Sequence, residues 1–102
     1  MVLNGIAKED FEKWLNKEMY YLGRHNFEDR DNNIEDLSDN FQNVLIIEWF
    51  DSVGIYITSD YFELNKGFYS EILDSNFAIV KPTRQEALTE AIKKANEYYN
   101  LE

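Results

Sequence analysis

Residues 81–100 read KPTRQEALTEAIKKANEYYN and contain the best-defined helix signal in the chain. Thr83, followed three residues later by Glu86, forms a capping box at the start of a helix. Pro82 ends the strand that precedes it. Apolar residues then recur at three- and four-residue steps: Ala87, Leu88, Ala91, Ile92, Ala95, Tyr98 and Tyr99. Because this stripe is narrow and rich in alanine, it predicts a helix that lies close to a sheet.

The residues before this helix predict antiparallel strands. Residues 44–50 and 55–58 are rich in β-branched and aromatic side chains, and residues 51–54 (DSVG) carry a turn signal between them. We therefore expect a β-hairpin here. Because residues 44–47 are apolar at every position, we expect a central strand covered on both faces. Residues 77–80 predict another short strand.

Residues 61–73 fit two structures. Their apolar positions fit one side of a helix, with Asp60 and Glu63 as a capping box. Residues 65–67 (NKG) also form a good hairpin turn, with the glycine supplying a positive φ angle. A glycine inside a helix costs about 1 kcal/mol relative to alanine. The balance favours strand, turn and strand.

The N-terminal residues predict an amphipathic helix over 5–22, with Asn4 as a candidate cap and Gly23 as a candidate stop. The apolar positions are Ala7, Phe11, Trp14, Leu15, Met19 and Leu22. Glu18 falls on the same side. It is either a partly buried carboxylate with a raised pKa or, more simply, a residue at the rim of the apolar stripe.

Together these elements predict an α+β fold with two layers, in which N-terminal and C-terminal helices pack on an antiparallel sheet of three to four strands. A chain of 102 residues is expected to form one domain, here residues 1–100. Residues 101–102 are consistent with a cloning scar.

Composition excludes several classes of function. The chain has no cysteine, which excludes disulfides, zinc–thiolate sites and cysteine nucleophiles and fits a cytoplasmic setting. The net charge of −10 argues against direct binding to nucleic acid or anionic membranes. We find no secretion leader, and no apolar run near the ~18 residues of a membrane span.

The sequence carries no enzyme motif. His25 is the only histidine, and the four glycines match no phosphate-binding loop. Glu48, Asp51 and Glu71 would lie near one another on the predicted sheet, but acids on a solvated face explain them equally well. We therefore assign no catalytic residue, no metal and no cofactor, and expect a protein that is not an enzyme.

The acidic stretch 28–40, EDRDNNIEDLSDN, is rich in the carboxylate and amide side chains of calcium loops. Counted from Asp29, the position that needs glycine holds Ile34, and the position that needs a bidentate glutamate holds Asn40. The two most demanding positions both fail, so the stretch does not predict an EF-hand.

The same stretch also predicts a short helix from about residue 33, with Asn32 as its cap. Ile34, Leu37 and Phe41 would face the core. Three acids would then face outward as an acidic patch: Glu35, Asp36 and Asp39. Such a patch is compatible with mimicry of DNA phosphates, and also with the solvated helix face of any acidic protein.

Aromatic residues provide a second candidate surface. Tyr20 falls on the polar side of the first helix, and Trp49 and Tyr56 fall on the predicted hairpin. Tyrosine and tryptophan beside charged residues are frequent anchors of protein interfaces. In a small two-layer fold, such residues also serve as core.

The short strand leading into KPTRQEALTEAIKKANEYYN, the lack of cysteine and the single proline resemble small uncharacterised proteins of prophages and other mobile elements of low-GC Gram-positive bacteria. The resemblance covers the last third of the chain. It implies a non-enzymatic accessory or host-interaction role, and it transfers no site residue.

The leading hypothesis is a small cytoplasmic module, compatible with a phage origin, that binds a protein partner through an aromatic sheet face and an acidic rim. The candidate partner is basic, and the module itself is a monomer or weak homodimer. The alternative is a DNA mimic that inhibits a basic nucleic-acid-binding protein. A small hydrolase or ligand-binding domain comes third.

Overall fold

The structure is a computed structural model in which residues 1–21 and 37–101 are described. Its elements in chain order are α1 (Gly5–Tyr21), α2 (Asp39–Ser52), β1 (Ile57–Phe62), the 3-10 turn η3 (Glu63–Asn65), β2 (Gly67–Ile72), β3 (Ala78–Lys81) and α3 (Arg84–Asn100). The predicted α+β class is confirmed. None of the helices in the described ranges is long and apolar enough to cross a membrane.

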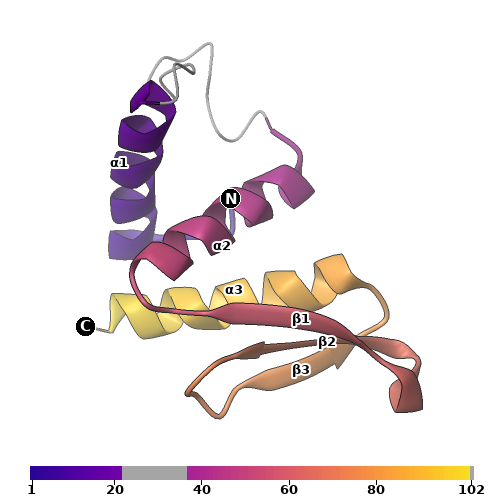
Figure 1. Ribbon diagram of the computed structural model, residues 1–102. Helices are drawn as coiled ribbons and strands as arrows, with labels where there is room; N and C mark the ends of the chain where they lie inside the picture. The colour runs from indigo at the N-terminus through magenta and orange to yellow at the C-terminus, as the bar shows by residue number, and fades with distance from the viewer. Residues whose placement is uncertain (22–36, 102) are drawn as a thin grey trace.

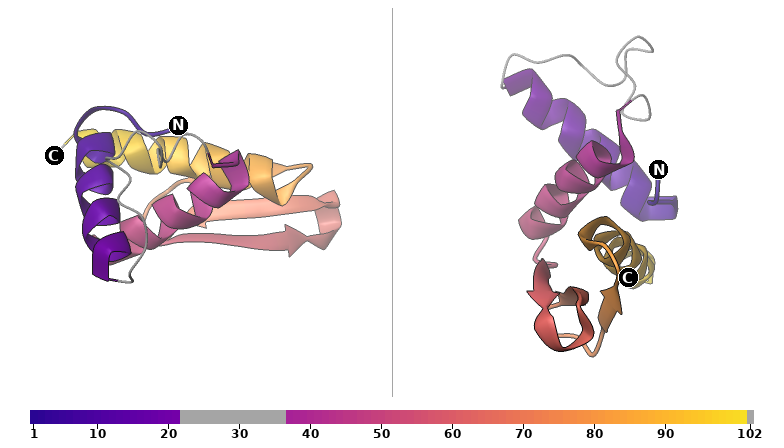
Figure 2. Two further views of the ribbon diagram at one scale, coloured as in Figure 1. Left: turned by 90° about the horizontal axis from the view of Figure 1, so that it is seen from above. Right: turned by 90° about the vertical axis from the view of Figure 1, so that its right-hand side faces the viewer.

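The sheet has the strand order β1-β2-β3 and is antiparallel throughout. Helix α3 contacts all three strands, and it also contacts α1 and α2. Figure 1 shows α1, α2 and α3 on the same side of the sheet, and Figure 2 shows the same arrangement from two further directions. The N-terminal helix thus packs on α3 and α2, and α3 separates it from most of the sheet.

The C-terminal helix forms as the sequence predicts. The Thr83 hydroxyl accepts a hydrogen bond from the Glu86 backbone N–H at 3.1 Å, which satisfies one of the free donors at the helix start. The alanines of the apolar stripe are fully buried. Arg84 lies over the ring of Phe68 in β2, so the side of α3 that bears Arg84 faces the sheet. Ala87 and Ala91 follow Arg84 at helical spacing, and their small side chains permit a close approach.

The predicted hairpin of residues 44–50 and 55–58 is wrong, because residues 39–52 form helix α2. The Ser38 hydroxyl caps this helix by accepting the Phe41 N–H at 3.2 Å. Val44 was expected on a strand covered on both faces, but it is 55% exposed. The turn signal at residues 51–54 is real and ends a helix instead: Gly54 has a φ of +84° and donates its N–H to the Asp51 carbonyl.

The aromatic core lies where the three long helices meet. The Trp49 ring centroid lies 5.9 Å from that of Phe11 in α1 and 4.9 Å from that of Tyr99 in α3, both in edge-to-face geometry. It also lies 4.7 Å from Phe50 on its own helix. Such ring pairs add about 0.5–1.5 kcal/mol beyond the burial of their area. The tryptophan therefore joins α1, α2 and α3 in one cluster.

A cluster of asparagines joins the start of the chain to its end. The Asn4 side chain, expected as the cap of α1, instead accepts hydrogen bonds from the amides of Asn96 and Asn100, each at 3.0 Å. The Asn96 side chain accepts the Asn4 backbone N–H at 3.0 Å. The first turn of α1 is capped from α3, because Ala7 donates its N–H to the Asn100 side-chain oxygen at 2.8 Å. These bonds fix the start of α1 on the last turns of α3.

Replacing Asn100 with alanine removes this cap and leaves the Ala7 N–H without its acceptor. We expect a loss of about 1 kcal/mol in the free energy of unfolding, the usual effect of deleting a helix cap. Glu97→Ala changes an exposed residue of the same turn and serves as the control, with an expected effect within about 0.5 kcal/mol. Urea unfolding followed by circular dichroism measures both, and equal effects of the two changes would contradict the capping role.

The second expected hairpin, around residues 65–67, is confirmed, because β1 and β2 flank this turn. Its glycine acts differently from the expectation. Lys66 takes the left-handed conformation, with φ 48° and ψ 44°. Gly67 is needed for space, because a Cβ atom there would lie 2.8 Å from the carbonyl oxygen of Lys81 and 3.1 Å from a methyl group of Val80. Gly67 therefore allows β3 to pair closely with β2.

Two neighbouring substitutions in this turn are expected to change stability in opposite directions. Lys66→Gly relieves the left-handed strain of a non-glycine residue and stabilises the protein by up to about 1 kcal/mol. Gly67→Ala forces β2 and β3 apart and destabilises it by about 1–3 kcal/mol. Thermal unfolding of both variants decides the point: a destabilised Lys66→Gly protein, or a neutral Gly67→Ala protein, would contradict this account of the turn.

Candidate functional site

The residues expected at a partner site do not form one surface in the described structure. Glu35 and Asp36 lie outside the described residues, and so does the side chain of Tyr20. Asp39 is exposed in the first turn of α2. Tyr56 is 47% exposed between α2 and β1. Trp49 is only 2% exposed, so its assignment to a binding surface is wrong: it belongs to the core.

The expected helix of residues 33–41 is also different. Helix α2 begins at Asp39, and Phe41, which was expected to face the core, is 46% exposed. Leu37 does pack against the core. The acidic patch proposed for DNA mimicry therefore has one member, Asp39, among the described residues. Glu18 and His25 likewise have side chains outside the described part.

The sheet register divides the strands into two faces. Ile57, Phe68 and Ile72 lie on the side toward the helices, since Arg84 of α3 lies over Phe68 and Ile57 pairs with Ile72 in the core. Because side chains alternate along a strand, the intervening positions point to the other side. We call this set the bare sheet face: Thr58, Asp60, Phe62, Gly67, Tyr69, Glu71, Ala78 and Val80.

None of the described helices lies on the bare sheet face, as Figures 1 and 2 show. The side chains agree with this view: Thr58, Asp60 and Ala78 are exposed, and Tyr69 and Val80 are only partly buried. Phe62 is 38% exposed, although it is a large apolar residue. Within residues 1–21 and 37–101, the sheet is thus covered by helices on one side only.

The bare sheet face carries an aromatic pair and two acids. The rings of Phe62 and Tyr69 lie 6.4 Å apart between centroids. Asp60 lies directly opposite Tyr69 across the β1–β2 pair, and Glu71 lies two residues along the same strand as Tyr69. The residues of the bare sheet face include no lysine and no arginine. The face therefore combines apolar area with negative charge.

The two acidic side chains of this face interact with neighbouring groups. Glu71 interacts with the Tyr69 hydroxyl and raises the pKa of that phenol, because the hydrogen bond to the carboxylate favours the protonated form. Burial and repulsion between the two negative charges raise the pKa further. Asp60 accepts the backbone N–H of Tyr61 at 2.8 Å, which uses a donor on the outer edge of β1. Both carboxylates therefore lie near the aromatic pair.

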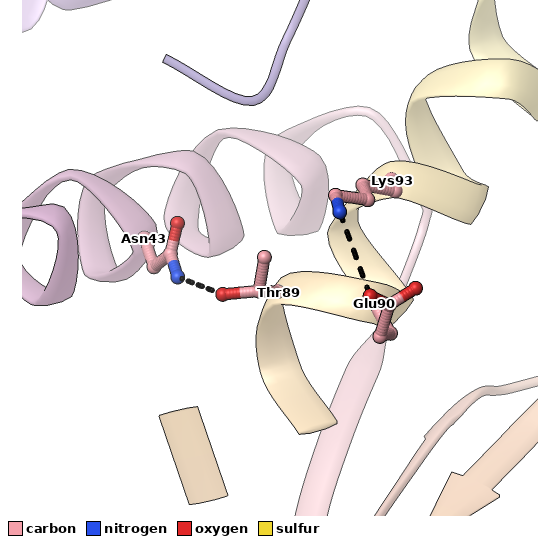
Figure 3. A network of polar contacts seen from close by, with 4 residues as sticks. All are labelled: Asn43, Thr89, Glu90 and Lys93. Atoms are coloured by element: carbon pink, nitrogen blue, oxygen red, sulfur yellow. Dashed lines mark hydrogen bonds and ion pairs between the residues drawn. The ribbon is translucent and has the colours of Figure 1, made fainter. Parts of the chain in front are cut away.

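The described surface also has two hollows. One, of about 310 Å³, lies beside the start of α3 and includes Lys81, Gln85 and Glu90 in its lining. The other, of about 230 Å³, lies between the N-terminal residues, α2 and α3. Figure 3 shows the contacts beside them: Asn43 donates to the Thr89 hydroxyl at 3.1 Å, and Lys93 pairs with Glu90 at 3.5 Å.

Neither hollow has a lining that indicates a catalytic or metal-binding site. The Asn43–Thr89 bond joins α2 to α3 and is structural. The acids that were expected to share the sheet lie on different elements, since Glu48 and Asp51 belong to α2 and Glu71 belongs to β2. No group of three or more metal-ligating side chains comes together in residues 1–21 and 37–101. The bare sheet face is therefore the better candidate site.

Sequence reasoning missed this face because it assigned the aromatic surface to the expected hairpin of residues 44–58, most of which is helix α2. The necessary signal is present in the sequence. The hairpin turn predicted at residues 65–67 carries it, because alternation along the two strands places Asp60 and Phe62 on the same face as Tyr69 and Glu71. The general expectation of an aromatic sheet face with acids therefore had the right features, but other residues supply them.

A comparison with models of protein families gives no match, and comparisons with curated proteins and with solved structures give none either. The assignment of a function therefore depends on the geometry of this chain alone.

Proposed function

We propose that the protein is a small non-enzymatic module that binds a protein partner through the bare sheet face. The observation that carries this proposal is the aromatic pair Phe62 and Tyr69 on the side of the sheet that the described helices leave uncovered. Antiparallel sheets that face water usually carry polar side chains there. Aromatic side chains on such a face are instead typical of the centre of a protein interface.

The composition of the face supports the same function. Phenylalanine and tyrosine bring large apolar area with little side-chain entropy, and they are frequent anchors in interfaces. Thr58, Asp60 and Glu71 surround them with polar groups, which matches the polar rim of an interface that must also exist free in water. The face is thus suited to a partner that binds and leaves.

The wider setting is part of the proposal. An accessory role that acts through a host protein agrees with the resemblance of the C-terminal region to proteins of prophages and mobile elements. The absence of cysteine favours a reducing compartment such as the cytoplasm. The net charge of −10 opposes self-association, which favours a monomer or weak homodimer.

The double variant Phe62→Thr, Tyr69→Thr tests the proposal, because threonine keeps a high β-propensity and removes both rings. We expect partner capture from a lysate of the native host, measured by quantitative mass spectrometry, to fall at least about tenfold, as for the loss of interface hot spots. Circular dichroism confirms that the variant is folded.

The matched control is Phe41→Gln, Val44→Gln, which removes exposed apolar side chains from α2 and leaves the sheet unchanged. The control protein should capture the same partner as the unchanged protein. Binding does not depend on the bare sheet face if the double variant still captures the partner, or if the α2 control loses capture to the same extent.

A further inference from the structure

The bare sheet face has negative charge without a counter-charge of its own. Its set includes Asp60 and Glu71 and no cationic residue, and the whole chain has a net charge of −10. Three cations lie close to this set in sequence. Lys66 lies in the turn between β1 and β2, and Lys81 and Arg84 belong to the helix side of the sheet, where Arg84 covers Phe68. A partner that covers the bare sheet face must therefore supply the positive charge, or it would bury carboxylates without a partner.

The helix side of the sheet shows how an arginine fits an aromatic residue of β2. The guanidinium carbon of Arg84 lies 5.1 Å from the ring centroid of Phe68, within the range of a cation–π contact. Tyr69, the next residue along β2, presents its side chain to the opposite side. None of the cations in the described part of the chain contacts the Tyr69 ring.

Strand pairing places the carboxylates of Asp60 and Glu71 near the Tyr69 ring. Asp60 and Val80 are the direct neighbours of Tyr69 across the strands. Glu71 lies in the adjacent row between Thr58 and Ala78, whose side chains are small and leave its carboxylate open to an approaching group. Phe62 lies opposite Gly67, so no side chain stands across from its ring.

We propose that the bare sheet face binds an arginine-bearing segment of a basic protein, with one guanidinium over the Tyr69 ring and its N–H groups toward Asp60 and Glu71. This inference rests on the proposed function and specifies the chemistry of the partner. Arginine fits better than lysine, because its planar group stacks on an aromatic ring while it donates hydrogen bonds in its own plane. Phe62 then packs against the apolar part of the same segment.

A capped pentapeptide, Arg-Val-Arg-Val-Arg, serves as the probe, and the same peptide with citrulline in place of arginine is its neutral control. Titration of the isotope-labelled protein is followed by the shifts of its backbone amides in NMR spectra. We expect saturable shifts in β1 and β2 around Asp60 and Tyr69 with the arginine peptide, and none with the citrulline peptide. The lysine analogue should bind more weakly than the arginine peptide.

Two variants with the same net charge separate a specific site from general attraction. Asp60→Asn, Glu71→Gln removes the two carboxylates of the bare sheet face, and the amide oxygen that this change introduces at position 60 can still accept the Tyr61 N–H. Glu63→Gln, Asp74→Asn removes two carboxylates from the turns at the ends of the strands. The first double change should weaken binding of the arginine peptide roughly threefold to tenfold, as expected for the loss of exposed ion pairs. The second should have no more than a small effect.

Equal weakening by the two variants, shifts centred on α2, or equal binding of the citrulline peptide would each overturn the arginine site. These results differ from failure of the proposed function, which is measured by capture of the native partner. If capture depends on Phe62 and Tyr69 while the arginine peptide does not bind at β1 and β2, the face binds a partner of other chemistry and only this further inference is wrong.

Discussion

The position of α3, which packs on all three strands and also contacts α1 and α2, is the constraint on which the rest of the structure depends. One side of this helix meets the sheet with small side chains, among them Ala87 and Ala91, so that the helix axis lies close to the strands. Another side meets α1 through Asn96 and Asn100, and meets α2 through Thr89. A single helix therefore belongs to two interfaces, and neither could form without it.

The two interfaces use different physical interactions. Against the sheet, burial of apolar area provides the stabilisation. Against α1, the side-chain oxygens of Asn96 and Asn100 accept directional hydrogen bonds from the backbone N–H groups of Asn4 and Ala7. These bonds fix where α1 starts, because side chains from α3 take the place of a local cap. Buried polar groups of this kind fix a unique arrangement when each of them has a partner. The arrangement also stacks the described helices on one side of the sheet, and none of them covers the other side.

An uncovered sheet face has consequences for function. The protein is small, and its apolar residues are divided between the helix cluster around Trp49 and the side of the sheet that faces α3. Phe62 and Tyr69 belong to neither group. Their partial exposure reduces the apolar area that is buried on folding, which is why we interpret them as residues for a partner. Under the proposed function, the nearby Asp60 and Glu71 would select for positive charge when a partner covers the face.

Local signals in the sequence predicted much of the fold and little of the site. Thr83 with Glu86 predicted the start of α3, and residues 65–67 predicted the β1–β2 turn, because caps and turns depend on neighbouring residues only. Residues 44–50 have strand propensity but form a helix, because burial of Leu45, Ile46, Trp49 and Phe50 at helical spacing outweighs that propensity. The expected strand at residues 44–50 placed Trp49 on a surface, although Trp49 lies in the core. The residues that share the bare sheet face are known only from the pairing register of the actual strands.

The central claim, that the sheet is covered on one face and bare on the other, is tested most directly by thiol labelling. The chain has no cysteine, so each variant carries a single reporter. Ala78→Cys places a thiol on the bare sheet face, and Ser70→Cys places one at a fully buried position on the helix side. In the isolated native protein, we predict labelling of the cysteine at position 78 at the rate of a free thiol, and of that at position 70 only upon unfolding. Equal protection of both thiols would contradict the account, because it would mean that the second face is also covered.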